Sequence, residues 1–157
     1  MKVVILCGGL GTRLREETEF RPKPMVNIGT YPILWHIMKI YAHQGYNDFV
    51  LALGYKGEMI KNYFIHYEFM KNDVTLELGK PENFCIHHQH EEKGWKITLA
   101  DTGEKTLKGG RLKKVEKYIT DDTFMMTYGD GVADIDLRSL LSFHKSHGKL
   151  AMVSWPR

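Results

Sequence analysis

The amino-acid sequence predicts an α/β fold in which helices flank a mostly parallel central sheet, with a small antiparallel hairpin attached. Short apolar runs typical of buried strands alternate with segments of helical periodicity along the chain. Two of these runs end in glycine clusters, at Gly8-Gly9 and at Gly129-Asp130-Gly131. Because ligands of such sheets bind beyond the carboxyl ends of the strands, both clusters mark the expected site.

The first half of the chain predicts two strands and two helices. Apolar runs at residues 3–7 and 48–53 predict the strands. Between them, residues 32–43 carry apolar side chains at helical spacing, and Pro32 suits the first turn of a helix. Residues 58–67 predict the second helix.

The second half predicts four further strands and two helices. We expect strands at residues 74–78, 95–100, 124–128 and 150–153, and helices at residues 112–119 and from about residue 137. The strand over residues 95–100 is expected to pair with the stretch around residues 84–86 as the hairpin. Asp136 is a suitable N-cap for the last helix, which Gly148 ends.

Composition excludes several classes of protein. The 157 residues suffice for one domain with a real core, and a net charge of only +3 argues against a nucleic-acid surface. Cys7 and Cys85 form neither a disulfide framework nor a zinc pattern. No apolar run approaches the roughly 20 residues that span a bilayer, and the N-terminus does not read as a signal peptide. We therefore expect a cytoplasmic protein that binds neither membrane nor nucleic acid.

The most informative stretch, residues 6–13, reads Leu-Cys-Gly-Gly-Leu-Gly-Thr-Arg. Glycine lets a phosphate approach the backbone closely, and consecutive free N–H groups form an anion-binding nest. Arg13 and, ten residues on, Lys23 add two positive charges, a combination that suits a polyphosphate. The spacing is neither that of the P-loop nor that of the dinucleotide fingerprint, which disfavours a nicotinamide oxidoreductase. Three glycines alone could simply turn the chain.

Asp130 lies between two glycines where the strand over residues 124–128 ends. A carboxylate there is well placed to hold Mg²⁺, a hard cation that prefers oxygen ligands. The alternative is a turn aspartate that bonds its own backbone, but a phosphate loop at the same sheet edge favours the metal. His87, His88 and His90 lack the further ligands of a tetrahedral zinc site and suggest a hairpin surface.

These motifs resemble the sugar nucleotidyltransferase family, in particular its glucose-1-phosphate cytidylyltransferase branch. The similarity covers the glycine loop and Arg-Pro-Lys-Pro from residue 21, and continues through residues 32–38, 101–103, 109–113, 127–134 and 143–148. Gly109-Gly110-Arg111-Leu112 stands where other members carry a Gly-Thr-Ala-Gly-Ala-Leu-like element, which points to the cytidylyl branch. The resemblance implies a Rossmann-like nucleotidyltransferase fold.

The resemblance also implies an activity, the transfer of a cytidylyl group from CTP to glucose 1-phosphate with Mg²⁺ as cofactor and pyrophosphate as the second product. Arg13 and Lys23 would be catalytic, and Asp130 would hold the metal. Nucleotide contacts would come from residues at the strand ends: Leu6, Cys7, Gly8, Gly9, Leu10, Gly11, Thr12, Arg13, Lys23, Thr102, Arg111 and Gly129. Thr102 and Arg111 would address the cytosine. Relatives commonly assemble into homo-oligomers.

Several interpretations stay open. The chain is such an enzyme, a CTP-binding module without turnover, or a uridylyl- or thymidylyltransferase of the same fold. Arg111 could instead belong to a basic helix face with Lys114 and Lys117. Relatives continue with a segment that supplies a second metal ligand and part of the sugar pocket, and the strand expected at residues 150–153 would normally lead into a further connection. We therefore expect residues 1–157 to form a single nucleotide-binding domain that is C-terminally incomplete.

Overall fold

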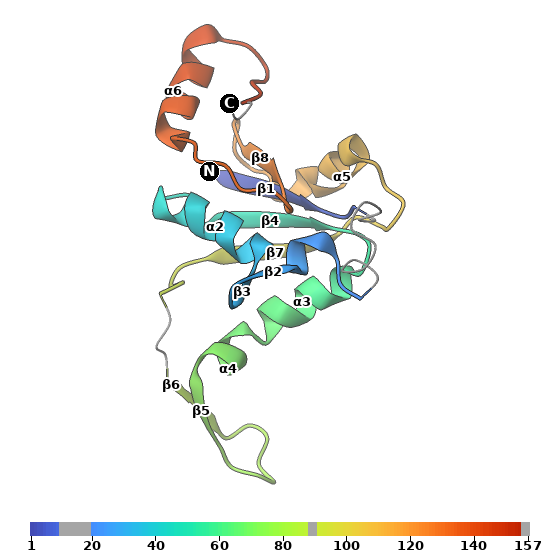
Figure 1. Ribbon diagram of the computed structural model, residues 1–157, viewed down its shortest axis with the longest axis vertical. Coiled ribbons are helices and arrows are strands. Elements are labelled where there is room, and N and C mark those ends of the chain that lie inside the picture. The colour runs from blue at the N-terminus through green and yellow to red at the C-terminus, as the bar shows by residue number, and fades with distance from the viewer. Residues whose placement is uncertain (10–19, 88–90, 155–157) are drawn as a thin grey trace.

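The centre of the molecule is a four-stranded parallel sheet with the strand order β7-β4-β1-β8 (Figure 1). A computed structural model describes residues 1–9, 20–87 and 91–154. The strands of this sheet are β1 (Lys2–Cys7), β4 (Asp48–Leu53), β7 (Lys96–Asp101) and β8 (Met125–Tyr128). In the register of the sheet, Cys7 lies opposite Leu53, which lies opposite Asp101. The carboxyl ends of three neighbouring strands are therefore level at one edge.

Helices cover both faces of this sheet. They are α2 (Ile33–His43), α3 (Gly57–Ile65), α4 (Tyr67–Lys71), α5 (Lys108–Val115) and α6 (Leu137–His147), with 3-10 turns η1 (Lys23–Met25) and η2 (Glu116–Tyr118). Alternate strand side chains point to opposite faces. Ile5 and Leu51 pack in the layer of α2, α3 and α6, whereas Val4 and Val50 pack against Val115 of α5.

The antiparallel pairings lie outside the main sheet. β2 (Asn27–Ile28) pairs with β3 (Tyr31–Pro32), and β5 (Asp73–Leu76) pairs with β6 (Phe84–His87). The β5–β6 hairpin projects from one end of the molecule, opposite to α6 (Figure 1). The prediction that residues 84–86 pair with residues 95–100 is wrong. The latter stretch instead joins the central sheet beside β4, where Ile97 and Leu99 pack against the core.

Two further element predictions are corrected. The helix expected at residues 112–119 begins earlier, at Lys108, and ends at Val115 before the turn η2. The strand expected at residues 150–153 is absent from the part of the chain that the structure describes. Leu150 and Val153 are 103% and 84% exposed, so no strand among the described residues covers this apolar run.

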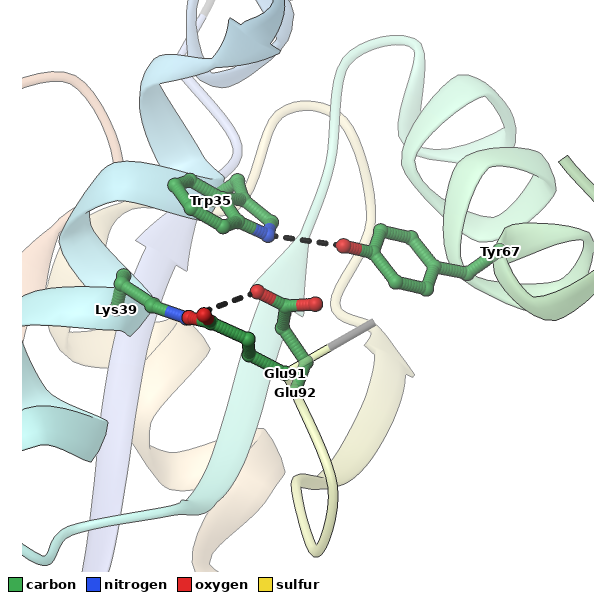
Figure 2. Close-up of polar contacts among 5 residues, drawn as sticks. All are labelled: Trp35, Lys39, Tyr67, Glu91 and Glu92. Atoms are coloured by element: carbon green, nitrogen blue, oxygen red, sulfur yellow. Dashed lines mark hydrogen bonds and ion pairs between the residues drawn. The ribbon is translucent and has the colours of Figure 1, made fainter. Parts of the chain in front are cut away.

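A polar cluster fastens α4 and the segment before β7 to α2 (Figure 2). The indole N–H of Trp35 donates to the hydroxyl of Tyr67 over 3.0 Å. Lys39 Nζ lies 3.1 Å from a carboxylate oxygen of Glu91 and 3.0 Å from one of Glu92. These contacts anchor the base of the hairpin away from the carboxyl ends of the strands.

Within the described ranges, none of the helices is long and apolar enough to cross a membrane.

Candidate active site

Gly129 brings the end of β8 close to β1 and η1. Its backbone N–H donates to the Leu6 carbonyl over 3.0 Å. A Cβ at position 129 would lie 3.0 Å from Cys7 Sγ and 3.0 Å from Pro24 Cγ, which is closer than side-chain atoms normally pack. A larger residue would therefore have to push these neighbours aside, and the close approach of Gly129 sets the place of the next residue, Asp130.

Lys23 and Asp130, two predicted site residues far apart in the sequence, come together at this edge. Lys23 Nζ lies 3.6 Å from Asp130 Oδ2. The side chains are 22% and 44% exposed, so both charges can reach a ligand from solvent. Lys23 opens the turn η1, which the buried Pro24 fixes against the protein. An ammonium and a carboxylate here provide one group for phosphate oxygens and one for a cation.

The two predicted site residues on β1, Leu6 and Cys7, are buried. The side chain of Leu6 packs on the α5 side of the sheet and that of Cys7 on the α2 side. Burial raises the pKa of the Cys7 thiol, and the nearby negative charge of Asp130 raises it further. Gly8 and Gly9 follow directly beyond the strand, and Gly9 is exposed.

Four further predicted residues, Leu10, Gly11, Thr12 and Arg13, lie outside the described residues.

Thr102 and Arg111 belong to a buried hydrogen-bond network at the same edge. Arg111 is 4% exposed and Thr102 is 1% exposed. The Thr102 hydroxyl donates to the Leu53 carbonyl and accepts from Arg111 Nη1 over 2.6 Å. Burial lowers the pKa of the Arg111 guanidinium, and the nearby carboxylate of Asp101 partly opposes this shift. The alternative of a solvated basic helix face is therefore wrong for Arg111.

Sequence reasoning missed two residues that complete this network. A Cβ on Gly54 would lie 2.4 Å from Arg111 Nη1, so the guanidinium needs glycine there. Lys114 Nζ donates to the Thr102 carbonyl over 2.9 Å. Gly54 directly follows a buried strand, and Lys114 lies one helical turn from Arg111. These two features of the sequence could have identified Gly54 and Lys114 as neighbours of the candidate site.

The residues at this edge fit Mg²⁺ better than a metal held by protein ligands alone. Among the residues with described positions, no group of three or more His, Cys, Asp or Glu side chains could hold a metal ion. Mg²⁺ is commonly bound by one or two carboxylates together with substrate phosphates and waters. The half-exposed carboxylate of Asp130 meets that requirement, and its neighbour Lys23 suits the phosphates.

Two cavities differ in their relation to this edge. A cavity of about 120 Å³ lies at the ends of β4 and β7, lined by residues that include Gly54, Glu58 and Asp101. A larger one of about 350 Å³ is lined by Tyr67 and Trp95, among others. The larger cavity lies beside the polar cluster that fastens α4 to α2, rather than at the carboxyl ends of the strands. The edge that carries Lys23, Asp130 and the glycines is therefore the candidate site.

The sequence is similar to those of known proteins over almost its whole length. Residues 2–156 match the model of the family described as nucleotidyl transferase. The chain is 52% identical over 155 residues to glucose-1-phosphate cytidylyltransferase of Salmonella typhimurium and 50% identical over 154 residues to the probable glucose-1-phosphate cytidylyltransferase of Bacillus subtilis. Each alignment covers 98% of this chain, which spans 60% and 59% of the length of the two relatives.

Solved structures share the fold. HddC from Yersinia pseudotuberculosis, complexed with GMP-PN, superposes with a TM-score of 0.64 at 28% identity, over 91% of this chain and 53% of its own. A UDP-glucose pyrophosphorylase from Acinetobacter baumannii has a TM-score of 0.65 at 20% identity, over 92% of this chain and 52% of its own, a likeness of fold alone. The family match over nearly the full length, with the predicted parallel sheet in place, shows that the chain belongs to the nucleotidyl transferase family.

Proposed function

We propose that residues 1–157 form the nucleotide-binding domain of a glucose-1-phosphate cytidylyltransferase. The observation that carries the proposal is the approach of Lys23 and Asp130 at the strand ends, where Gly129 lies against Cys7 and Pro24. It gains weight from the 52% identity to the Salmonella enzyme. In the reaction, a phosphate oxygen of glucose 1-phosphate attacks the α-phosphorus of CTP. The bond from the α-phosphorus to the bridging oxygen breaks, and pyrophosphate leaves.

The residues take distinct roles in this proposal. The backbone N–H groups of Gly8 and Gly9, with those of Leu10, Gly11 and Thr12 beyond, cradle the triphosphate. Arg13 neutralises charge on the departing pyrophosphate, and Lys23 draws the α-phosphate and the sugar phosphate together. Asp130 would hold Mg²⁺ through its carboxylate. When bound, the ion supplies charge neutralisation to the phosphates.

The test is pyrophosphate release by the 157-residue chain with CTP, Mg²⁺ and glucose 1-phosphate. We expect release to fall at least about 100-fold in Lys23→Met and Asp130→Asn, since each removes a charge aimed at the reacting phosphates. Asp134→Asn is the matched control, because Asp134 is an exposed carboxylate four residues along. Its release should equal that of the unaltered chain.

Calorimetry with CTP separates the alternatives. Binding without release would indicate a CTP-binding module and contradict turnover by this chain. Absence of CTP binding would overturn the assignment of the site. Competition by UTP or TTP that equals competition by CTP would contradict the choice of cytosine, and would favour a uridylyl- or thymidylyltransferase.

A further inference from the structure

The Arg111 guanidinium lies at the point where three parallel strands end. Its Nη2 donates to the Gly8 carbonyl beyond β1 over 2.8 Å, and its Nη1 donates to the Leu53 carbonyl at the end of β4 over 2.9 Å. Beyond β7 it donates to the carbonyls of Gly103 and Glu104, over 2.8 and 2.9 Å. One side chain from α5 thus joins the ends of β1, β4 and β7.

The glycines on either side show how closely this group is held. A Cβ on Gly8 would lie 2.1 Å from Arg111 Cζ, and one on Gly54 would lie 2.4 Å from Nη1. Neither position has room for any side chain while the guanidinium is in place. Burying a charge is costly unless its donors are satisfied, and here neutral oxygens satisfy both terminal nitrogens of Arg111.

The geometry of the peptide bond links the contact between Arg111 and the Gly8 carbonyl to the direction of the Gly9 N–H. The Gly8 carbonyl and the Gly9 N–H belong to one planar trans peptide unit, so they point in opposite directions. Because Arg111 holds the carbonyl inward, the N–H of Gly9 points away from the protein. Gly9 is exposed, and among the described residues other than its chain neighbours no atom lies within 4 Å of where its Cβ would stand. An anion there meets an N–H group already aimed at it.

We propose that Arg111 is a positioning residue for phosphate binding, which acts through the Gly8 carbonyl on the Gly9 N–H rather than by contact with the base. This proposal rests on the proposed function, because it needs the triphosphate to bind at the glycine loop. It revises the expectation that Arg111 addresses the cytosine.

The test measures binding of CTP and of inorganic triphosphate, each with Mg²⁺, to the unaltered chain and to Arg111→Ala. Loss of a hydrogen bond to a charged group corresponds to a change in affinity of roughly 10- to 100-fold. We expect both ligands to lose affinity by the same factor, although triphosphate has no base. Triphosphate affinity that stays unchanged while CTP affinity falls would overturn the proposal and leave the proposed function intact. Absence of CTP binding by the unaltered chain would overturn both.

Two further variants separate positioning from general loss of structure. Gly54→Ala pushes the guanidinium away from the opposite side and should reproduce the loss for both ligands. Val115→Ala is the matched control, because Val115 is fully buried on the same helix and points into the core. It should lower stability and leave both affinities unchanged.

Chemical rescue gives an independent readout. Millimolar guanidinium added to Arg111→Ala should restore affinity for both ligands, because it fills the space between Gly8 and Gly54. Failure of rescue in a variant shown to be folded by circular dichroism would contradict the proposal.

Discussion

At the scale of single residues, the candidate site depends on glycines that lie close against neighbouring atoms. A Cβ added to Gly8, Gly54 or Gly129 would lie 3.0 Å or less from a neighbouring side-chain atom. Gly131, two residues after Gly129, has open space around it and no positive φ. Gly129 and Gly131 therefore form a matched pair for testing whether the close approach at Gly129 contributes to stability.

Gly129→Ala should destabilise the protein by about 1–3 kcal/mol, the usual cost of adding atoms to a packed region. The new methyl would push on Cys7 and Pro24, which also bear on the position of Lys23. Urea denaturation measures the loss, and Gly131→Ala should change stability by less than about 0.5 kcal/mol. Equal stabilities of the two variants would contradict the packing argument.

The two cysteines should differ in reactivity. Cys7 is buried and its thiol pKa is raised, first by burial and then by Asp130, whereas Cys85 is exposed. A thiol reagent such as DTNB at pH 8 should therefore modify Cys85 rapidly and Cys7 only after denaturation, since the thiolate is the nucleophile. A fast reaction that persists in Cys85→Ser would contradict this prediction.

The same shift in pKa predicts how stability depends on pH. Above the ordinary thiol pKa of about 8.5, the unfolded chain releases the Cys7 proton while the folded chain retains it, so stability falls as pH rises. Cys7→Ala should flatten this fall in a series of urea titrations at rising pH.

Lys23 and Asp130 show how far sequence reasoning reaches at this scale. The place of Asp130 could be predicted, because parallel strands place their carboxyl ends at one edge, whereas Lys23 lies on the turn η1 and was expected there from its charge and from the family resemblance. Most of the hydrogen-bond partners of Arg111 could not be predicted, because apart from the Thr102 hydroxyl they are main-chain carbonyls, which every residue provides. The roles assigned to site residues stay predictions.

At the scale of elements, α6 is held by contacts at its first turn. The Asp136 carboxylate accepts from the backbone N–H groups of Arg138 and Ser139, over 3.0 and 3.1 Å. From the end of α2, the Gln44 side chain accepts from the Leu137 N–H and donates to the Ile135 carbonyl. Leu137 is then buried against the core. The expectation that Asp136 caps this helix is confirmed.

Asp136→Ala should destabilise the protein, with the effect lost in acid. Hydrogen bonds from the Ser139 hydroxyl and from the backbone lower the pKa of Asp136. Its contribution is therefore present above the ordinary aspartate pKa of about 3.9 and disappears as pH falls through the lower folded value. Urea titrations at pH 7 and pH 3 measure this difference. Asp134→Ala, which alters an exposed carboxylate, should change stability little at either pH.

The elements that could not be predicted are those decided by their neighbours. β7 and β6 both read as short strands, and only the apolar face of β7 packing on the core assigns it to the central sheet. Residues 150–153 form an apolar run of strand length but have no paired neighbour in the described chain. Tertiary context of this kind overrides local propensity in sheets.

At the scale of the whole molecule, stability is concentrated in the two apolar layers around β1 and β4. The parallel sheet and its helices could be predicted because alternation of strand and helix leaves few other arrangements. The hairpin lies outside these layers (Figure 1). Assembly into a homo-oligomer and a cytoplasmic location stay predictions.

Two leucine-to-alanine substitutions, one in the core and one on the hairpin, should show how stability is distributed over the molecule. Leu51→Ala, at a fully buried position, should cost about 2–5 kcal/mol because it leaves a cavity in the layer shared with α2. Leu76→Ala, on the hairpin where the side chain is 60% exposed, should cost less than about 0.5 kcal/mol. Thermal or urea unfolding measures both. Similar losses would mean that the hairpin carries part of the core.

The position of β8 has a consequence for the order of folding. β1 pairs with β4 and β4 with β7 across moderate stretches of chain, whereas β1 reaches β8 only across most of the sequence. Loop closure is slowest for the most distant pairing, so β8 should join last. Met125→Ala should then speed unfolding and hardly slow folding in stopped-flow traces, and a slowed folding limb would contradict this order. Because Asp130 arrives with β8, a chain still folding would expose its glycine loop before the acidic group opposite Lys23 is in place.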